Sequence, residues 1–151
     1  MRPIRFRIWH VRLKLLLLVT GIEFDVGEIS SINFLDPATK KFATEDIFIR
    51  YYKPTVYLMQ FTGLRDKRGE EIFEGDIVEW KGEMGQIMFS VGRFVFANSA
   101  GWKDNLLVND QLEIIGNIWE NEELLSQVQL PPSGISLEEM IEAYDKFHPR
   151  A

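Results

Sequence analysis

The chain has 151 residues, of which 26% are charged and 46% hydrophobic, with a net charge of −6 and no cysteine. This length and composition indicate one globular domain or two closely joined subdomains, and the lack of cysteine excludes disulfides, thiolate metal sites and cysteine nucleophiles. The lack of cysteine also suits a reducing cytoplasm, where we expect the protein to act. The acidic balance argues weakly against a protein built mainly to bind nucleic acid.

Charge is distributed unevenly along the chain. The first fourteen residues contain five basic residues and no acidic one, whereas residues 115–151 contain seven acidic residues against Lys146 and Arg150. Opposite charges at the two ends favour contact between them, either within one chain or between two chains.

In the first third of the chain, alternating apolar and polar residues predict a series of strands. Residues 4–9 alternate between isoleucine or phenylalanine on one face and arginine or tryptophan on the other. A turn or strand entry is expected over residues 10–14. The next strand, over residues 13–19, is expected to end at Thr20-Gly21. Further strands are predicted over residues 22–26, 29–35 and 42–52, with a type I turn at Asp36–Thr39.

The apolar run Leu13–Val19 is much shorter than the about 20 residues that a membrane-spanning helix needs. It follows basic residues, as the apolar part of a secretion signal does, but no small-residue cleavage site follows Val19. We therefore expect a core strand here, and no membrane contact.

The clearest pattern lies in the stretch Leu58–Val78. A strand over residues 57–62 shows period-two alternation and is expected to end at Gly63. Asp66–Gly69 predicts a tight turn, because aspartate accepts a hydrogen bond from the backbone two residues on and glycine adopts positive φ. A second turn is predicted at Glu74–Asp76, where Asp76 is expected to bind backbone N–H groups. Reversals this frequent are typical of a small antiparallel barrel or sandwich.

This stretch resembles the YopX family of bacterial and phage proteins. The resemblance covers residues 4–125 and departs from the family pattern at Glu122, where the family often has proline. It implies a largely β protein, commonly encoded by a phage or prophage, with no established activity and no catalytic residues to assign. The residues that carry it are Ile4–Trp9, Gln60–Leu64, Asp66, Gly69, Glu71-Ile72, Glu74–Val78, Ile114–Ile118, Glu120-Asn121 and Glu123–Leu125.

Beyond this stretch, residues 81–85 predict a hairpin loop, and residues 86–97 predict two further strands of a meander. Residues 98–111 are the least regular part of the chain. The expected fold is mainly β, with an N-terminal β subdomain, a small SH3-like β-barrel and a C-terminal α-helix. The corresponding segments are residues 1–57, 58–125 and 126–151, the last comprising a linker and an amphipathic helix.

The C-terminal segment predicts helix in two places. Residues 120–128 predict one or two helical turns. After a linker at residues 131–134, Ser136 and Glu139 form a capping box. A single helical stripe follows, which must pack on its own protein, on another copy or on a partner. Its members are Leu137, Met140, Ile141, Tyr144 and Phe147.

Three groups of side chains invite a catalytic or binding interpretation, and each is more simply structural. His10 and His148 are expected at the surface rather than on a metal. The carboxylates are expected to be solvated or to fix turns. The aromatic residues could form a stacking platform for nucleic acid, but few basic residues lie near them, and Phe94 and Phe96 have the spacing of core residues. The carboxylates are Glu70, Glu71, Glu74 and Asp76, and the aromatic residues are Trp80, Phe89, Phe94, Phe96 and Trp102.

The sequence therefore predicts an accessory protein of the bacterial cytoplasm, without catalysis or cofactor, and the resemblance implies that a phage or prophage encodes it. It would act by contact with a host or phage protein, or with itself as a homo-oligomer. One alternative is a nucleic-acid-binding module whose contacts are N-terminal arginines and whose affinity falls steeply with salt. A weaker alternative is a metal-dependent hydrolase that uses Asp76 and its neighbours. The arginines are Arg2, Arg5, Arg7 and Arg12.

Overall fold

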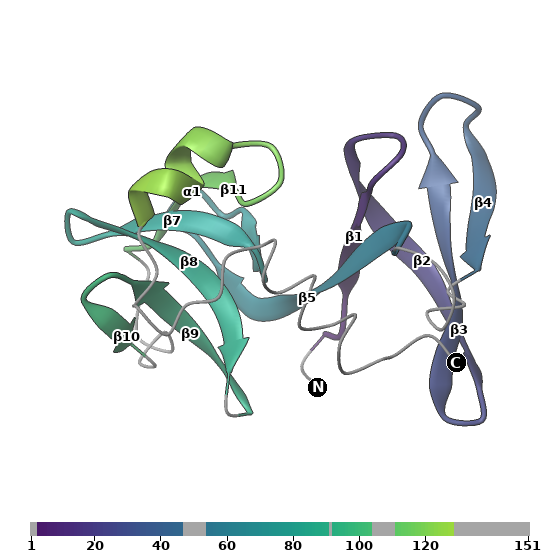
Figure 1. Ribbon diagram of the computed structural model, residues 1–151, viewed down its shortest axis with the longest axis horizontal. Helices are drawn as coiled ribbons and strands as arrows, with labels where there is room; N and C mark the ends of the chain where they lie inside the picture. Colours follow the sequence, from purple (N-terminus) through teal and green to yellow (C-terminus); the bar gives the residue numbers. More distant parts are fainter. Residues whose placement is uncertain (1–2, 47–53, 91, 104–110, 129–151) are drawn as a thin grey trace. The chain divides into compact units, whose positions relative to one another are not determined.

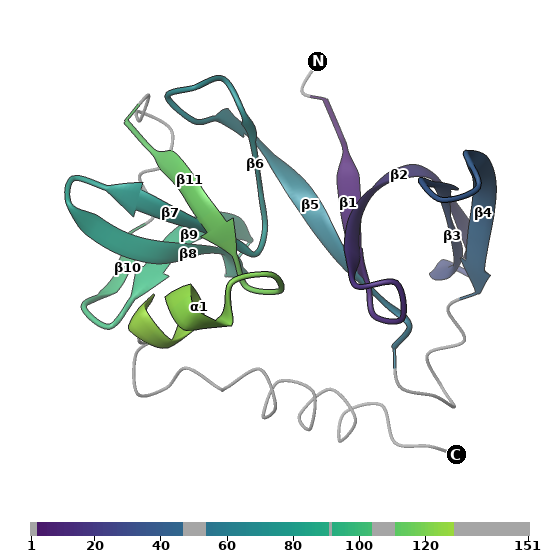
Figure 2. The same cartoon turned by 90° about the horizontal axis from the view of Figure 1, so that it is seen from above.

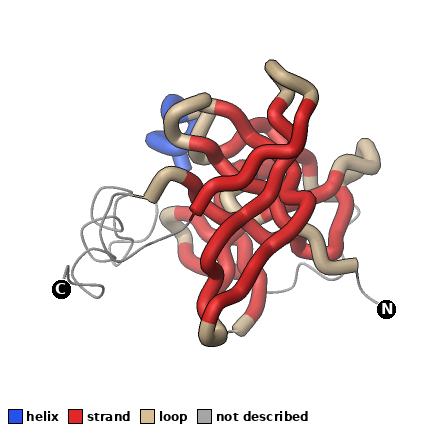
Figure 3. The backbone as a smooth tube through the Cα atoms, turned by 90° about the vertical axis from the view of Figure 1, so that its right-hand side faces the viewer, coloured by secondary structure: helices blue, strands red, loops and turns tan. Residues whose placement is uncertain are grey.

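The computed structural model describes residues 3–46, 54–90, 92–103 and 111–128, and antiparallel strands dominate it (Figures 1 and 3). The predicted mainly β fold is confirmed, whereas the SH3-like character of the second part stays a prediction. The described residues divide into an N-terminal unit, within residues 5–59, and a C-terminal unit, which comprises residues 3–4 and those within 60–128. Strand β5 (Val56–Arg65) begins in the first unit and ends in the second.

The strands of the N-terminal unit belong to a six-stranded sheet with the order β4-β3-β2-β1-β5-β6, whose last strand, β6 (Glu71–Phe73), follows in the C-terminal unit. Its inner face holds a core of buried Ile8, Leu17, Ile32, Phe34 and Val56. Tight turns join its first four strands, and the turn after Asp36 forms as predicted, with the Asp36 carboxylate accepting the Ala38 N–H at 2.9 Å. These strands are β1 (Phe6–His10), β2 (Leu15–Asp25), β3 (Glu28–Asp36) and β4 (Lys41–Asp46).

The prediction of two short strands separated at Thr20-Gly21 is wrong. Residues 15–25 form one strand, β2, and its register against β3 shifts between Val19 and Gly21. The shift is a β-bulge, in which one extra residue is accommodated without ending the pairing. Glycine fits here because an added Cβ would lie 3.1 Å from the Asn33 amide.

In the C-terminal unit, a five-stranded sheet has the order β10-β9-β8-β7-β11, and the end of β5 pairs with β6. The predicted meander is confirmed as β7, β8 and β9. A short strand, β10, lies in the segment expected to be least regular. The elements are β6 (Glu71–Phe73), β7 (Asp76–Trp80), β8 (Glu83–Ser90), β9 (Arg93–Asn98), β10 (Gly101–Lys103), β11 (Glu113–Asn117) and helix α1 (Glu122–Val128).

Two boundaries differ from the prediction. Strand β5 passes through Gly63, at φ 88°, and continues to Arg65, because an irregularity in its pairing with β6 absorbs the glycine. The predicted loop 81–85 contracts to a two-residue turn, in which Lys81 and Gly82 have φ of 51° and 78°. Two successive positive φ angles characterise the type I′ turn, whose twist matches that of the flanking strands.

Both faces of the C-terminal sheet are covered. Adjacent residues Ile77 and Val78 of β7 point to opposite faces and belong to different hydrophobic clusters. Val78 packs with Trp80 and Phe96, whereas Ile77 packs with Val128 of α1. Figure 2 shows α1 beside β8 and β11. The presence of α1 confirms the helical turns predicted over residues 120–128.

Candidate interaction surface

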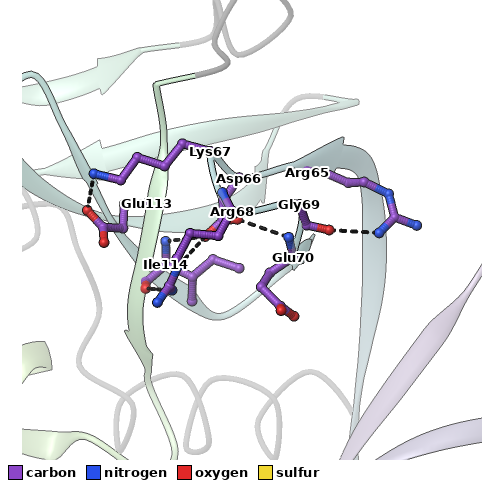
Figure 4. Close-up of polar contacts among 8 residues, drawn as sticks. All are labelled: Arg65, Asp66, Lys67, Arg68, Gly69, Glu70, Glu113 and Ile114. Atoms are coloured by element: carbon purple, nitrogen blue, oxygen red, sulfur yellow. Dashed lines mark hydrogen bonds and ion pairs between the residues drawn. The ribbon is translucent and has the colours of Figure 1, made fainter.

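The turn at Asp66–Gly69 is fixed by the Asp66 carboxylate, which is fully buried. Its Oδ1 accepts the backbone N–H of Arg68 at 2.9 Å and that of Glu70 at 3.0 Å (Figure 4). Its Oδ2 accepts the N–H of Ile114, in β11, at 3.1 Å. Asp66 therefore forms the predicted turn and also ties it to a strand far along the chain.

These contacts perturb the acidity of Asp66. Burial raises the pKa of the carboxyl. Hydrogen bonds from the N–H groups of Ile114, Glu70 and Arg68, together with the Arg68 charge, lower this pKa by more than burial raises it. The pKa of Asp66 therefore lies below its ordinary value, and the ionised form is favoured. Because both oxygens bind the protein's own backbone, this carboxylate is a structural group.

The predicted carboxylate cluster does not converge on one point. Glu70 is exposed, and Glu71 lies 2.9 Å from the Arg65 guanidinium. Asp76 accepts the N–H of Phe73 at 2.8 Å, which confirms its predicted role in the turn. Within the described ranges, no three His, Asp or Glu side chains form a group that could hold a metal ion.

Glu74 behaves differently from its neighbours. Burial raises its pKa, and the hydrogen bond that it accepts from the Gln60 N–H, at 2.9 Å, only partly offsets this. This hydrogen bond to the backbone of β5 links the Glu74–Asp76 turn to that strand.

The expectation that His10 lies at the surface is wrong, because its side chain is 1% exposed. Its Nδ1 accepts the N–H of Leu13 at 3.2 Å, so Nε2 carries the proton and donates to Glu45 at 2.7 Å. Its ring packs edge-on against Phe34, with centroids 5.5 Å apart. The sequence gives no sign of this, since Glu45 is 35 residues away. His148 lies outside the described residues.

The aromatic residues of the C-terminal unit are divided between core and surface. Trp80 and Phe96 are buried and meet edge-on at 5.6 Å. Phe89 is 52% exposed, and its ring centroid lies 5.1 Å from that of the half-buried Phe94. The side chain of Trp102 lies outside the part that the structure describes. Among the described rings, Trp80 and Phe96 are core residues, so they supply no exposed stacking surface.

The outer face of the N-terminal sheet carries large apolar side chains that are exposed. Leu18 on β2, Leu35 on β3 and Phe42 on β4 are 65%, 47% and 77% exposed. Leu35 pairs with Phe42, and the pairing of Val19 with Phe34 places Leu18 next to Leu35. These three side chains form one line across three strands, here called the apolar row.

Strand alternation explains why the apolar row faces outward. The neighbours of its members, Leu17, Phe34 and Ala43, all pack into the inner core, so the row must point to the other face. Half-buried Trp9 and Leu16 pair with each other one step along the same face and widen the apolar area. In the described residues, none of the hydrophobic core clusters includes a member of the row.

The predicted basic residues do not all lie together. Arg7 pairs with Leu18 and so lies at one end of the apolar row. Arg5 is exposed just before β1, and the two-residue spacing places it on the same side as Arg7. Arg12 lies in the turn after β1, where its guanidinium is 3.9 Å from Glu45.

Several predicted contact residues lie outside the described ranges. They are Arg2 and the stripe Leu137, Met140, Ile141, Tyr144 and Phe147.

Residues 5–126 match the family model described as YopX protein. The chain belongs to the YopX family. The crystal structure of protein EF1440 from Enterococcus faecalis is similar to it, with a TM-score of 0.57 and 30% sequence identity, over 83% of this chain and 99% of that one. No curated protein matches the chain.

In this YopX protein, the residues that carry the predicted family resemblance include Asp66, Gly69 and Asp76, which fix turns. The apolar row was not predicted, although the sequence contains a signal for it. Leu18 adjoins Leu17, and Leu35 adjoins Phe34, so neighbouring positions on one strand are both apolar and both faces of the sheet are apolar. The helix in the described ranges is too short and polar to span a membrane.

Proposed function

We propose that this YopX protein is a non-catalytic accessory protein, encoded by a phage or prophage, that acts by protein–protein contact in the bacterial cytoplasm. The contact surface is the apolar row of Leu18, Leu35 and Phe42, and the first partner is a second copy of the chain. The observation that carries the proposal is the alignment of three exposed apolar side chains across adjacent strands.

The physical argument is the cost of leaving the row in water. Fully burying one leucine or phenylalanine side chain stabilises a protein or complex by about 1.5–3 kcal/mol. Three such side chains in one line provide a continuous surface, whereas scattered apolar residues on a surface have no such significance. A partner that covers Leu18, Leu35 and Phe42 together gains this energy in a single contact.

The placement of the arginines favours this function over nucleic-acid binding. Arg12 lies beside Glu45, which partly neutralises its charge, and Arg7 adjoins Leu18. A nucleic-acid surface would instead present several basic side chains without neighbouring carboxylates. The described carboxylates support the non-catalytic part, since Asp66 and Asp76 bind backbone N–H groups.

Gel filtration with light scattering tests the proposal on the full-length chain over a range of concentrations. We expect the wild type to form dimers or larger species, and the double variant Leu18→Ser/Phe42→Ser to be monomeric. The control is Phe24→Ser, since Phe24 is 65% exposed but lies outside the row. A wild type that stays monomeric at high concentration, or equal association of the double variant, would contradict the proposal.

A further inference from the structure

We infer that strand β4, at one edge of the six-stranded sheet, pairs antiparallel with β4 of a second copy, about a two-fold axis at Ala43. The inference goes beyond the proposed function, because the contact uses the edge of the sheet and not the face that carries the apolar row. The outer side of an edge strand presents backbone N–H and C=O groups that can pair with another strand. Strand β4 is first in the strand order, and among the described strands only β3 pairs with it (Figure 1).

The other sheet edges in the described residues are short or already occupied. Strands β6 and β10, which form two of them, have three residues each. On the edge strand β11, the Ile114 N–H donates to Asp66 at 3.1 Å, and the Ile114 carbonyl accepts from Arg68 at 2.7 Å. Strand β4 has six residues, which makes it the longest of these edges and the one best able to pair with another copy.

Symmetry restricts the registers that this pairing can adopt. A two-fold axis that relates two antiparallel strands is perpendicular to the sheet, so it leaves every side chain on its own face. Paired residues therefore share a face and are an even number of positions apart in the sequence. With the axis at Ala43, Ala43 lies opposite itself, and Phe42 lies opposite Thr44.

The charges along β4 favour this register over its neighbours. Lys41 lies opposite Glu45 of the second copy, and Lys40, in the turn just before β4, comes next to Asp46. The axis makes each contact occur twice, and opposite charges attract across paired strands. An axis one residue away loses these pairs, and an axis at Glu45 places the two Glu45 carboxylates opposite each other, which is unfavourable.

Both lysines and Asp46 are available for this contact. Lys40, Lys41 and Asp46 are exposed, and no ion pair joins any of them to another residue of the described ranges. Glu45 also binds His10 of its own chain, so the Lys40–Asp46 contact is the better one to test. Charges on an edge strand usually prevent pairing. On β4 they attract in one register, and so they select that register.

The same register brings the apolar rows of the two copies together. The two Phe42 side chains lie on the outer face, diagonally across the axis, at a separation that aromatic side chains can bridge. Phe42 is 77% exposed in one chain, and this contact covers part of it. The rows then meet end to end, and the contact leaves their outward faces for the association proposed above.

Because the chain has no cysteine, engineered cysteines report the register without background. In full-length Ala43→Cys, the two cysteines lie directly opposite, with Cβ atoms about 5 Å apart, near the separation that a disulfide needs. In full-length Thr44→Cys they are offset along the strands, with Cα atoms about 8 Å apart, farther than a disulfide spans. We expect Ala43→Cys to link about tenfold faster during mild oxidation. Exposure alone would favour Thr44→Cys, since Thr44 is exposed and Ala43 is half-buried.

An exchange of charges between two variants tests the contact without cysteines. Full-length Lys40→Glu and full-length Asp46→Lys each bring like charges together twice, so each should associate about tenfold more weakly at low salt. A 1:1 mixture restores opposite charges in every mixed contact and should associate within about twofold of the wild type. Light scattering follows association, and circular dichroism checks the fold of each variant.

The control mixture replaces Asp46→Lys by Asp25→Lys, an equal change of charge at an exposed residue outside β4. It should associate no more strongly than Asp25→Lys alone, whereas the test mixture should associate more strongly than either of its components. Thr44→Cys that links as fast as Ala43→Cys would overturn the inference, and so would a test mixture that gains nothing over its components.

The same measurements separate this inference from the proposed function. If the charge variants lose association and Leu18→Ser/Phe42→Ser does not, the edge contact stands and the row is excluded. If Leu18→Ser/Phe42→Ser is monomeric, while the Ala43 link fails and the charge variants associate as the wild type does, the row stands and the edge contact is excluded. A wild type that stays monomeric at high concentration would exclude both.

Discussion

The two sheets of this protein differ in how their faces are covered. The C-terminal sheet is buried on both faces, with Val78 in one hydrophobic cluster and Ile77 in another under α1. The N-terminal sheet has a core on its inner face, while its outer face exposes Leu18, Leu35 and Phe42. The comparison shows that an apolar strand sequence does not determine burial, because burial requires a second layer.

The difference separates stability from binding. The groups of the Asp66 turn and of the C-terminal core bind or pack against other parts of the same protein. Changes to them should therefore lower the free energy of unfolding. The apolar row contributes little to the folded chain, so changes there should alter association. Paired variants, one in each region, can test this division.

Among changes to the polar groups and glycines, the largest effect is expected for Asp66→Asn. An asparagine amide that replaces Oδ2 would oppose the Ile114 N–H and leave a buried donor unpaired, which should reduce the free energy of unfolding by about 2–3 kcal/mol. The matched control is Asp36→Asn, which keeps the one oxygen that accepts the Ala38 N–H and should change stability by less than about 0.5 kcal/mol. Urea denaturation measures both, and equal losses would show that the Asp66 contacts have no special importance.

A smaller effect is expected for Gly85→Ala. A Cβ at this position would lie 2.4 Å from the ring of Phe96, which is fully buried. Such overpacking should cost about 1–3 kcal/mol. Gly21→Ala provides the contrast in the N-terminal sheet, because its nearest obstacle is the Asn33 side-chain amide at 3.1 Å. Thermal unfolding should show the larger loss for Gly85→Ala, and the reverse order would contradict the packing argument.

The stability of the wild type should also depend on pH through Asp66. Because the pKa of Asp66 is lowered in the folded protein, its contribution is complete above the unfolded value of about 3.9 and is lost as the pH falls through the folded value. The difference in stability between the wild type and Asp66→Asn should therefore shrink below about pH 4. Denaturation series at several pH values test this, and a difference that stays constant under acid conditions would exclude the linkage.

The smallest effect on folding is expected in the apolar row. Leu18→Ser and Phe42→Ser should each change the free energy of unfolding by less than about 0.5 kcal/mol, since these side chains are largely exposed. The same change at Phe96, which is fully buried, should cost about 3 kcal/mol or more. Chemical denaturation at a protein concentration below that of self-association isolates folding from binding. A large loss for Phe42→Ser would show that the row supports the fold.

Much of the fold could be predicted because its turns are local. The Asp66 carboxylate accepts the Arg68 N–H two residues on, and Gly69 takes positive φ, and both follow from residue type. The predictions that fail depend on distant partners. His10 is buried with its Nε2 donating a hydrogen bond to Glu45 across the sheet, and nothing near His10 in the sequence indicates this.

The sequence by itself determined the mainly β class, the family, the meander and the polar groups that fix the turns. These depend on side-chain periodicity and on hydrogen bonds between near neighbours. Only the tertiary structure decided that β2 continues through a bulge at Thr20, that His10 is enclosed, and that Leu18, Leu35 and Phe42 share one exposed line. The physical reason is that strand register and the covering of a face arise from contacts between segments, which no short stretch of sequence encodes.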